Sequence, residues 1–307
     1  MNTPPVTIPI ILDCDPGHDD AIALLLALGS REVELLGVTT VHGNQTLDKT
    51  TENALRVLEL ARRTDVPVAR GADRPLTREL SVAAHVHGES GLDGPELPAA
   101  TATPVEQHAV DFIAEHVTSK TVLVPVGPLT NIALALERGI RPAHIVLMGG
   151  AIAEGNMTPA AEFNIWADPE AAQQVFHAGV PVTMVGLDVT HKALLTPAWA
   201  DRFRDAGRLG VFVAELIEFF KQYHARTYGW DGAPIHDALA LAQVFRPDLV
   251  RTEHRNVEVE LESELTRGRT VVDLWRRTDR APNAHVGVDV DADAFFELLL
   301  ERVSGLD

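Results

Sequence analysis

Four aspartates within eight residues constrain this chain more than any other feature. They lie between an apolar run at 8–12 and a second apolar run at 21–28, and they are Asp13, Asp15, Asp19 and Asp20. Carboxylates this close raise one another's pKa unless positive charge compensates them. Hard divalent cations bind such oxygen ligands. The segment therefore predicts a strand, a turn and a helix that together hold a metal ion.

Neither helix electrostatics nor a common type of calcium loop accounts for the whole cluster. Asp19 and Asp20 open the predicted helix, where the helix dipole favours a negative charge. That accounts for one aspartate but not four. A calcium loop of the EF-hand type, counted from Asp13, requires Gly at its sixth position and Glu at its twelfth. The chain has His18 and Leu24 there, so we predict a metal site of another kind.

Strand-like and helix-like segments alternate through the first two thirds of the chain. The predicted strands are 6–12, 33–41, 66–69, 122–126, 145–148 and 182–185, and the segments between them include helices at 21–28 and 46–63. This alternation is typical of βαβ units. We predict an α/β fold with a mostly parallel, Rossmann-like central sheet flanked by helices. The last third predicts mixed additions, and the whole of 1–307 is expected to form a single domain.

Polar motifs follow five of the predicted strands. They are Asp13 with Asp15, the triplet 42–44, the pair 127–128, the pair 149–150, and Asp188. In parallel sheets, ligands bind beyond the carboxyl ends of the strands. These motifs are therefore expected to converge on one rim. The Gly- and Pro-rich region 70–100 predicts a long loop that borders the same site.

Three further segments carry chemistry that ordinary loop structure also explains. Residues 156–164 combine two amides and a carboxylate, which suit a ligand with several hydroxyl groups. The Gly-rich segment 87–94 contains His87, which in a plain surface loop would be solvated. His236 can act as a general acid or pack structurally, and Asp237 can simply cap a helix.

Composition excludes some partners. The formal net charge of −18 leaves no excess of Lys and Arg to meet the phosphates of nucleic acid or of an anionic membrane. No apolar run reaches the roughly 18 residues of a membrane span, and residues 1–5 lack a secretion-signal pattern. The single cysteine, Cys14, fits a reducing compartment. We expect a cytoplasmic protein.

Together these motifs resemble the nucleoside hydrolases, the inosine/uridine-preferring family of N-ribohydrolases. The resemblance runs from about residue 8 to the C-terminal helix, and the segments that carry it are 13–21, 87–94, 161–164 and 235–237. It implies an enzyme that hydrolyses the N-glycosidic bond of ribonucleosides to ribose and free base. It also implies one Ca²⁺ and a homo-oligomer, either a dimer or a tetramer.

The resemblance also implies a role for each matching residue. The Ca²⁺ ligands would be Asp15, Asp20, Asp237 and the carbonyl of Val126, and Asp15 with the metal would activate the attacking water. His236 would protonate the leaving base, with His87 near the base edge. Contacts to the rest of the nucleoside would come from Asp19, Asn44, Met148, Asn156, Glu162, Phe163 and Asn164. Of these, Asp19 and Asn164 would hold the ribose hydroxyls, and Asn156 and Glu162 the 5′-hydroxyl.

Three points stay open in the sequence. His18 together with His87 resembles the pyrimidine-preferring branch, so uridine and cytidine are expected to be favoured and inosine to be possible. Asp13 would not contact the metal itself and would orient the neighbouring residues that do. The segment before His236 would border the base, but its sequence does not select among four candidates, which are Tyr223, His224, Tyr228 and Trp230.

Two other functions compete with this one. A phosphatase of the haloacid dehalogenase type would use Asp13 as nucleophile and Mg²⁺ as metal, but Thr or Val is expected where Pro16 stands. A calcium-dependent protein that binds nucleosides or sugars would keep the hydroxyl-binding residues and would need no proton donor. The presence of His236 favours the hydrolase.

Overall fold

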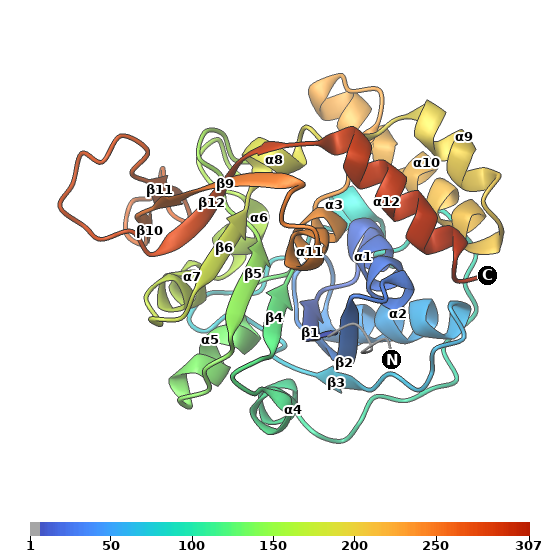
Figure 1. Cartoon of the computed structure of the whole chain (residues 1–307), viewed down its shortest axis with the longest axis horizontal. Coiled ribbons are helices and arrows are strands. Elements are labelled where there is room, and N and C mark those ends of the chain that lie inside the picture. Colours follow the sequence, from blue (N-terminus) through green and yellow to red (C-terminus); the bar gives the residue numbers. More distant parts are fainter. Residues whose placement is uncertain (1–6) are drawn as a thin grey trace, which may run out of the picture.

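An eight-stranded sheet organises residues 7–307, the part of the chain that this computed structural model describes. Val6, where the first predicted strand begins, lies outside the described residues, as do residues 1–5. The strand order is β3-β2-β1-β4-β5-β6-β12-β9 (Figure 1). The strands are β1 (Ile8–Cys14), β2 (Val33–Thr40), β3 (Val68–Arg70), β4 (Val122–Pro125), β5 (His144–Met148), β6 (Val182–Val185), β9 (Val250–Arg255) and β12 (Ala284–Val290).

All neighbouring strands run parallel except β12 and β9, which pair antiparallel. The predicted mostly parallel α/β sheet is confirmed. Chain order reverses between β1 and β4, since β2 and β3 extend the sheet to one side and β5 and β6 to the other. Open α/β sheets bind ligands at such a reversal, beyond the carboxyl ends of the strands.

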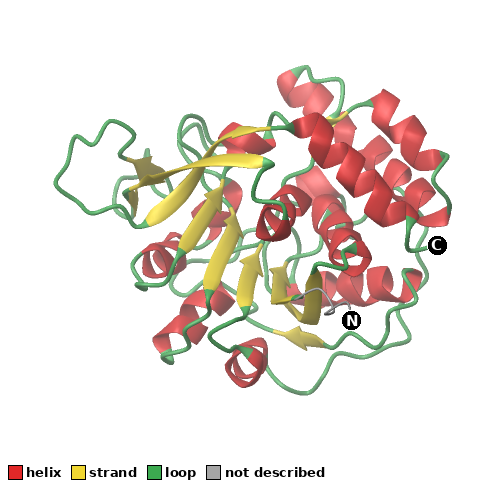
Figure 2. Cartoon of the chain, viewed as in Figure 1, coloured by secondary structure: helices red, strands yellow, loops and turns green. Residues whose placement is uncertain are grey.

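The sheet is buried on both faces because helices cover both (Figure 2). Alternate residues of β1 show this: Ile10 and Leu12 belong to one apolar cluster and Ile11 to the other. Such a run of apolar residues is typical of a central parallel strand. The first cluster includes α1 (His18–Gly29), α2 (Leu47–Leu60), α9 (Pro197–Arg204), α10 (Arg208–Tyr228), α11 (Asp237–Phe245) and α12 (Ala292–Ser304), and the second includes α4 (Ala109–His116), α5 (Thr130–Glu137) and α7 (Pro169–Phe176).

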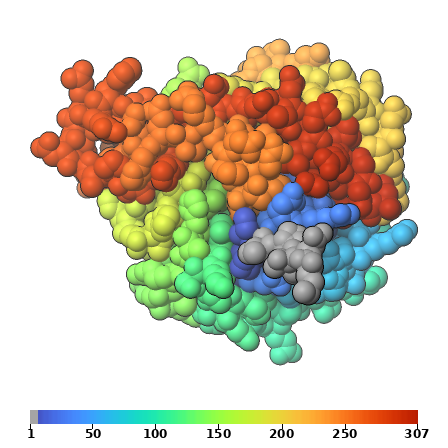
Figure 3. All heavy atoms as spheres, in the orientation of Figure 1, coloured from blue at the N-terminus to red at the C-terminus, as the bar shows by residue number. Residues whose placement is uncertain are grey.

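The C-terminal third adds mixed structure, as predicted, but in a form that the sequence does not reveal. The sequence does not predict β12 and β9, which extend the main sheet beyond β6. Two further strands, β10 (Val257–Val259) and β11 (Thr270–Val272), form a separate antiparallel pair. This pair and its loops project from the body of the molecule, at the left in Figures 1 and 3.

Short elements complete the rim of the sheet. The predicted long loop at 70–100 is confirmed, and it is interrupted by α3 (Ala84–His87). The other rim elements are α6 (Phe163–Ala167), α8 (Leu187–Thr190), β7 (Leu194–Leu195) and β8 (Ala233–Pro234). Within residues 7–307, no helix is both long enough and apolar enough to cross a membrane.

Candidate active site

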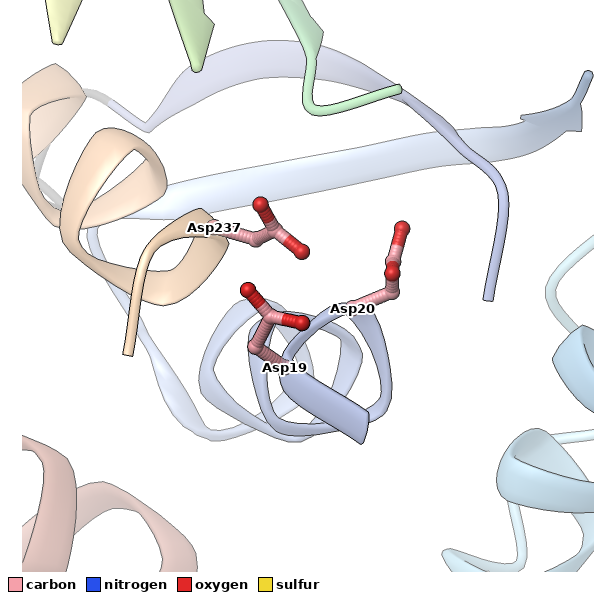
Figure 4. Close-up of side chains that lie close together, drawn as sticks. All are labelled: Asp19, Asp20 and Asp237. Atoms are coloured by element: carbon pink, nitrogen blue, oxygen red, sulfur yellow. The ribbon is translucent and has the colours of Figure 1, made fainter. Parts of the chain in front are cut away.

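Three buried aspartates form a carboxylate cluster between the first turns of two helices. Asp19 and Asp20 open α1, and Asp237 opens α11 (Figure 4). One carboxylate oxygen of each lies within 4.8 Å of the others. The N-terminal ends of helices carry partial positive charge, which favours carboxylates there. The two helix starts thus bring together residues from distant parts of the sequence.

Asp15 lies beside this cluster, just after the end of β1. Its Oδ2 accepts a hydrogen bond from the Asn44 backbone N–H at 2.7 Å, and its Oδ1 is buried without a hydrogen-bond partner in residues 7–307. Two glycines make room for this carboxylate. A Cβ atom at Gly43 would lie 2.1 Å from Oδ2, and one at Gly127 would lie 2.4 Å from Oδ1. Gly43 and Gly127, from the predicted 42–44 and 127–128 motifs, therefore leave the space that the Asp15 carboxylate occupies.

Asn44 joins Asp15 to Asp20. Its side-chain amide donates to Asp20 Oδ2 at 3.0 Å, while its backbone N–H binds Asp15. Asp20 also accepts hydrogen bonds from the backbone N–H groups of Asp15 and Gly17, at 3.0 and 2.9 Å. These bonds fix the two carboxylates relative to each other.

Burial without compensation dominates the electrostatics of the four carboxylates. It raises the pKa of Asp19 to about 7, and it raises the pKa values of Asp15, Asp20 and Asp237; neighbouring aspartates raise those of Asp15, Asp19 and Asp237 further. None of the ion pairs found in residues 7–307 involves these four aspartates. Clustered carboxylates with an unpartnered buried oxygen fit a hard divalent cation.

The carbonyl of Val126, the fourth predicted metal ligand, belongs to a residue that lines the same pocket. It accepts a hydrogen bond from the side-chain amide of Asn164 at 2.7 Å. A carbonyl oxygen has two lone pairs, so one is left for a ligand. The same amide also donates to the Met148 carbonyl at 3.2 Å, which ties Asn164 to the ends of β4 and β5.

One pocket above the cluster collects the other predicted residues. All seven residues assigned to the nucleoside line it, together with His87, Val126, His236 and Asp237. Asp15 and Asp20 are not among the lining residues, and they lie behind Asn44, to which both are bonded. The convergence of strand-end loops that the sequence predicts is therefore present in the structure.

The side of the pocket formed by residues 151–164 is strongly ordered by hydrogen bonds. The Glu162 carboxylate accepts the backbone N–H groups of Gly150, Asn164 and Ile165 at 2.8–3.1 Å. Burial outweighs these bonds and raises the pKa of Glu162 to about 7. Asn156 accepts the Phe163 N–H at 2.9 Å through its Oδ1, which leaves its amide group free to donate to a ligand.

Imidazole and aromatic rings form another part of the lining. His236 Nδ1 lies 2.7 Å from the Thr190 hydroxyl, and His87 Nδ1 lies 3.1 Å from His18 Nδ1. Burial lowers the pKa of both His87 and His236 well below the usual value, so both are neutral near pH 7. The rings that also line this side are those of Phe220, Tyr223, His224, Tyr228 and His191.

This geometry reduces the candidates for base contact in the segment before His236 from four residues to three. Three of the four candidates before His236 line the pocket, namely Tyr223, His224 and Tyr228. Trp230 instead stacks on Tyr228, with ring centroids 4.4 Å apart, and supports it from behind.

Sequence reasoning missed Thr190 and His191. Thr190 is fully buried and bonded to His236, while His191 lies in the lining. Thr190 ends the short helix α8, which follows β6, and His191 comes directly after it. Asp188 marks this segment as part of the rim, but no residue pattern singles out Thr190 or His191 within it.

Asp13 is held away from the pocket. Its Oδ1 accepts hydrogen bonds from the Thr39 hydroxyl at 2.5 Å and the Asn131 amide at 2.8 Å, and burial raises its pKa to about 7. It is fully buried and does not line the pocket. Asp13 Oδ1 is bonded to side chains of β2 and α5, and nothing in this placement favours Asp13 as the nucleophile of a phosphatase.

Comparison with known proteins agrees with the geometry. Residues 10–297 match the family model described as inosine-uridine preferring nucleoside hydrolase. The pyrimidine-specific ribonucleoside hydrolase RihA of Salmonella paratyphi B is 50% identical, over 97% of this chain and 99% of that protein. RihA of Salmonella typhimurium strain LT2 shows the same identity and coverage.

Solved structures show the same architecture. The purine-preferring ribonucleoside hydrolase from Gardnerella vaginalis superposes with a TM-score of 0.90 at 38% identity, covering 97% of this chain and 98% of that one. The plant nucleoside hydrolase PpNRh1 gives a TM-score of 0.87 at 32% identity, covering 97% and 99%. The resemblance seen in the sequence is confirmed: this chain belongs to the inosine-uridine preferring nucleoside hydrolase family of ribonucleoside hydrolases.

Proposed function

We propose that this chain hydrolyses pyrimidine ribonucleosides, uridine and cytidine above all, to ribose and free base. One observation carries the proposal. A single pocket is lined by buried carboxylates, by amides that can bind hydroxyl groups together with Glu162, and by imidazole and aromatic rings. A nucleoside has matching parts, because its ribose is rich in hydroxyls and its base is flat and carries protonatable atoms.

We propose Ca²⁺ as the metal, held by Asp15, Asp20, Asp237 and the Val126 carbonyl. Asp19 shares the carboxylate cluster and would contact the ribose hydroxyls next to the ion. When bound, the ion supplies positive charge that compensates the buried carboxylates and lowers the pKa of water and hydroxyl groups nearby. The all-oxygen donor set supports a hard cation of this kind.

The protein's own residues account for the remaining steps. Asp15 accepts the proton of the water that attacks the anomeric carbon, and its Oδ1 has no other partner in residues 7–307. The transition state resembles an oxocarbenium ion, as in the hydrolysis of O-glycosides. Asn164, tied to β4 and β5, holds the ribose, and Asn156 with Glu162 binds the 5′-hydroxyl.

His236 protonates the departing base. Burial keeps His236 neutral in the free protein, so it must first take up a proton from solvent and donate as the imidazolium. In that form the Thr190 hydroxyl can accept the Nδ1–H at 2.7 Å, which leaves the Nε2–H to the base. His87 lies in the lining, bonded to His18, and would face the edge of the base.

The preference for pyrimidines is supported by similarity, although relatives of different preference share this fold. The pyrimidine-specific relative is 50% identical, whereas the purine-preferring relative is 38% identical and superposes closely. Base choice therefore depends on local residues. His18 and His87 are the residues of this chain that we assign to it.

A panel of nucleosides tests the proposal directly. Uridine, cytidine, inosine, adenosine and thymidine are incubated with the calcium-loaded protein, and released sugar is measured as reducing ends. We expect uridine and cytidine to give the highest kcat/KM. Release of phosphate from p-nitrophenyl phosphate without ribose release would support the phosphatase instead, and a stable unhydrolysed uridine complex would support a binding protein.

Assembly and location are proposals as well. We propose a dimer or tetramer of this chain and a cytoplasmic location. Light scattering coupled to gel filtration measures the first, and a mass equal to one chain of 33.3 kDa would contradict it.

A further inference from the structure

We propose that Asp188 is a positioning residue for the 5′-hydroxyl subsite, acting through the backbone of the pocket loop, residues 151–162. The inference rests on the proposed function, because that subsite is part of it. The sequence analysis places Asp188 on the rim of the sheet, and the proposed function gives this residue no role. It does not line the pocket, so any effect on the substrate must pass through the residues it holds.

Asp188 holds the start of the pocket loop with both carboxylate oxygens. Its Oδ2 accepts the Ile152 N–H at 2.6 Å, and its Oδ1 accepts the Ala153 N–H at 3.1 Å. Asp188 lies on α8, shortly after β6, so its own position is set by the central sheet. Hydrogen bonds to a charged acceptor are shorter and stronger than those between neutral groups.

Thr270 completes this anchor from the other side. Its hydroxyl accepts the Ala151 N–H at 2.9 Å and donates to the Ala151 carbonyl at 2.7 Å. Three consecutive backbone N–H groups, at residues 151–153, are therefore bonded to side chains that lie outside the loop. Thr270 is buried, whereas Asp188 is partly exposed and can be changed without opening the core.

The loop depends on such anchors because residues 151–162 contain no strand or helix. Internal bonds fold the loop on itself, for example from Met157 N–H to the Ala161 carbonyl at 3.1 Å. Asn156 follows shortly after Ala153, and its side chain must reach the Phe163 N–H from there. Release of the backbone at 152 and 153 frees the segment that carries Asn156 into the pocket.

The Asp188→Asn variant tests the inference with a matched pair of substrates. The substitution keeps the shape but replaces one acceptor oxygen with an amide group that repels one of the two N–H groups. The kcat/KM values of uridine and 5′-deoxyuridine are measured with saturating calcium. We expect about a tenfold fall for uridine and less than about a twofold change for 5′-deoxyuridine, since only uridine uses the subsite.

Asp291→Asn is the matched control. Asp291 makes the same kind of bond, to the Ala294 N–H at 3.0 Å, but at the start of α12. We expect it to leave both substrates unchanged. Equal falls for both substrates in Asp188→Asn, or no fall, would overturn the inference while leaving the proposed function intact. A wild-type protein that hydrolyses neither substrate would overturn both.

Hydrogen exchange gives a second readout that does not need activity. Amides of residues 151–157 should exchange about tenfold faster in Asp188→Asn than in Asp291→Asn, because the anchoring bonds are weakened, and unchanged exchange would count against the inference. If Asp188→Asn does not fold, Thr270→Val removes the neighbouring anchor at Ala151 and is measured with the same two substrates. The same selective loss for uridine is expected, and a non-selective loss refutes the role.

Discussion

The hydroxyl of Thr190 offers the sharpest test of the proposed leaving-group chemistry. It lies 2.7 Å from His236 Nδ1, and Thr190 is fully buried. Thr190→Val removes this hydroxyl and nearly keeps the shape of the side chain. His236 then has no partner at Nδ1, so its ring can rotate and its Nε2–H is no longer directed at the base.

The size of the effect follows from that single bond. A buried polar group left without its partner costs about 1–3 kcal/mol of stability. A general acid contributes about 10²–10⁴-fold to the rate, and a mispositioned acid keeps part of this. We therefore expect kcat for uridine to fall about 10–100-fold, which corresponds to about 1.4–2.7 kcal/mol of transition-state stabilisation.

The assay compares two leaving groups. Uracil needs protonation as it departs, whereas the nitrophenolate of p-nitrophenyl β-ribofuranoside does not. Thr190→Val should reduce turnover of uridine strongly and of the nitrophenyl riboside less than about threefold, and Thr190→Ser should restore uridine turnover. An equal loss for both substrates would show that Thr190 only supports the fold, and the assignment of His236 as the acid would lose its structural basis.

Three further predictions concern charge at the site. Asp15→Asn should abolish turnover, and turnover near that of the wild type would contradict Asp15 as the base. The metal-free variant should melt no lower than the metal-free wild type, because the substitution removes one charge from a cluster of carboxylates that repel one another. Removal of the metal by a chelator should lower both the activity and the melting temperature, because an ion at about 100 times its Kd adds about 2.7 kcal/mol of stability. An unchanged melting temperature in a sample shown to be metal-free would refute a bound metal. Burial lowers the pKa of His224 from 6.5 to about 4. Between these two pH values the unfolded chain binds a proton at His224 that the folded chain does not, so His224 lowers the stability of the fold as the pH falls from 6.5 towards 4. The unfolding free energy at about pH 7 minus that at about pH 5, measured by denaturant titration, should be smaller in His224→Gln than in the wild type. Equal differences in the two proteins would contradict this effect of His224.

Much of the fold could be predicted because the central strands are strongly patterned. β1 and the second half of β2 are buried on both faces, and their apolar runs end in polar residues where the sheet ends. β9 and β12 could not be found in this way. β9, with the sequence VRTEHR, lies at the sheet edge with most of its residues partly or fully exposed, so no apolar run marks it.

Candidate site residues could be chosen from the sequence, but their arrangement could not. Asp15 and Asp19 carry the same side chain, and the structure shows how their surroundings differ: Asp15 is bonded to Asn44 and does not line the pocket, whereas Asp19 lines it. The sequence does not single out Thr190, because the role of a buried hydroxyl depends on the residue to which it is hydrogen-bonded. That partner, His236, is 46 residues away in the sequence.

The place of β12 in the sheet has a consequence for biosynthesis. The ribosome makes this strand after β9, yet β12 separates β6 from β9 in the finished sheet. Until residues 284–290 have emerged, β9 has no neighbour with which to pair in the sheet, although the nascent chain before it can already collapse. Completion of the sheet therefore waits for β12, because a chain that ends before residue 284 lacks the strand that joins β9 to β6.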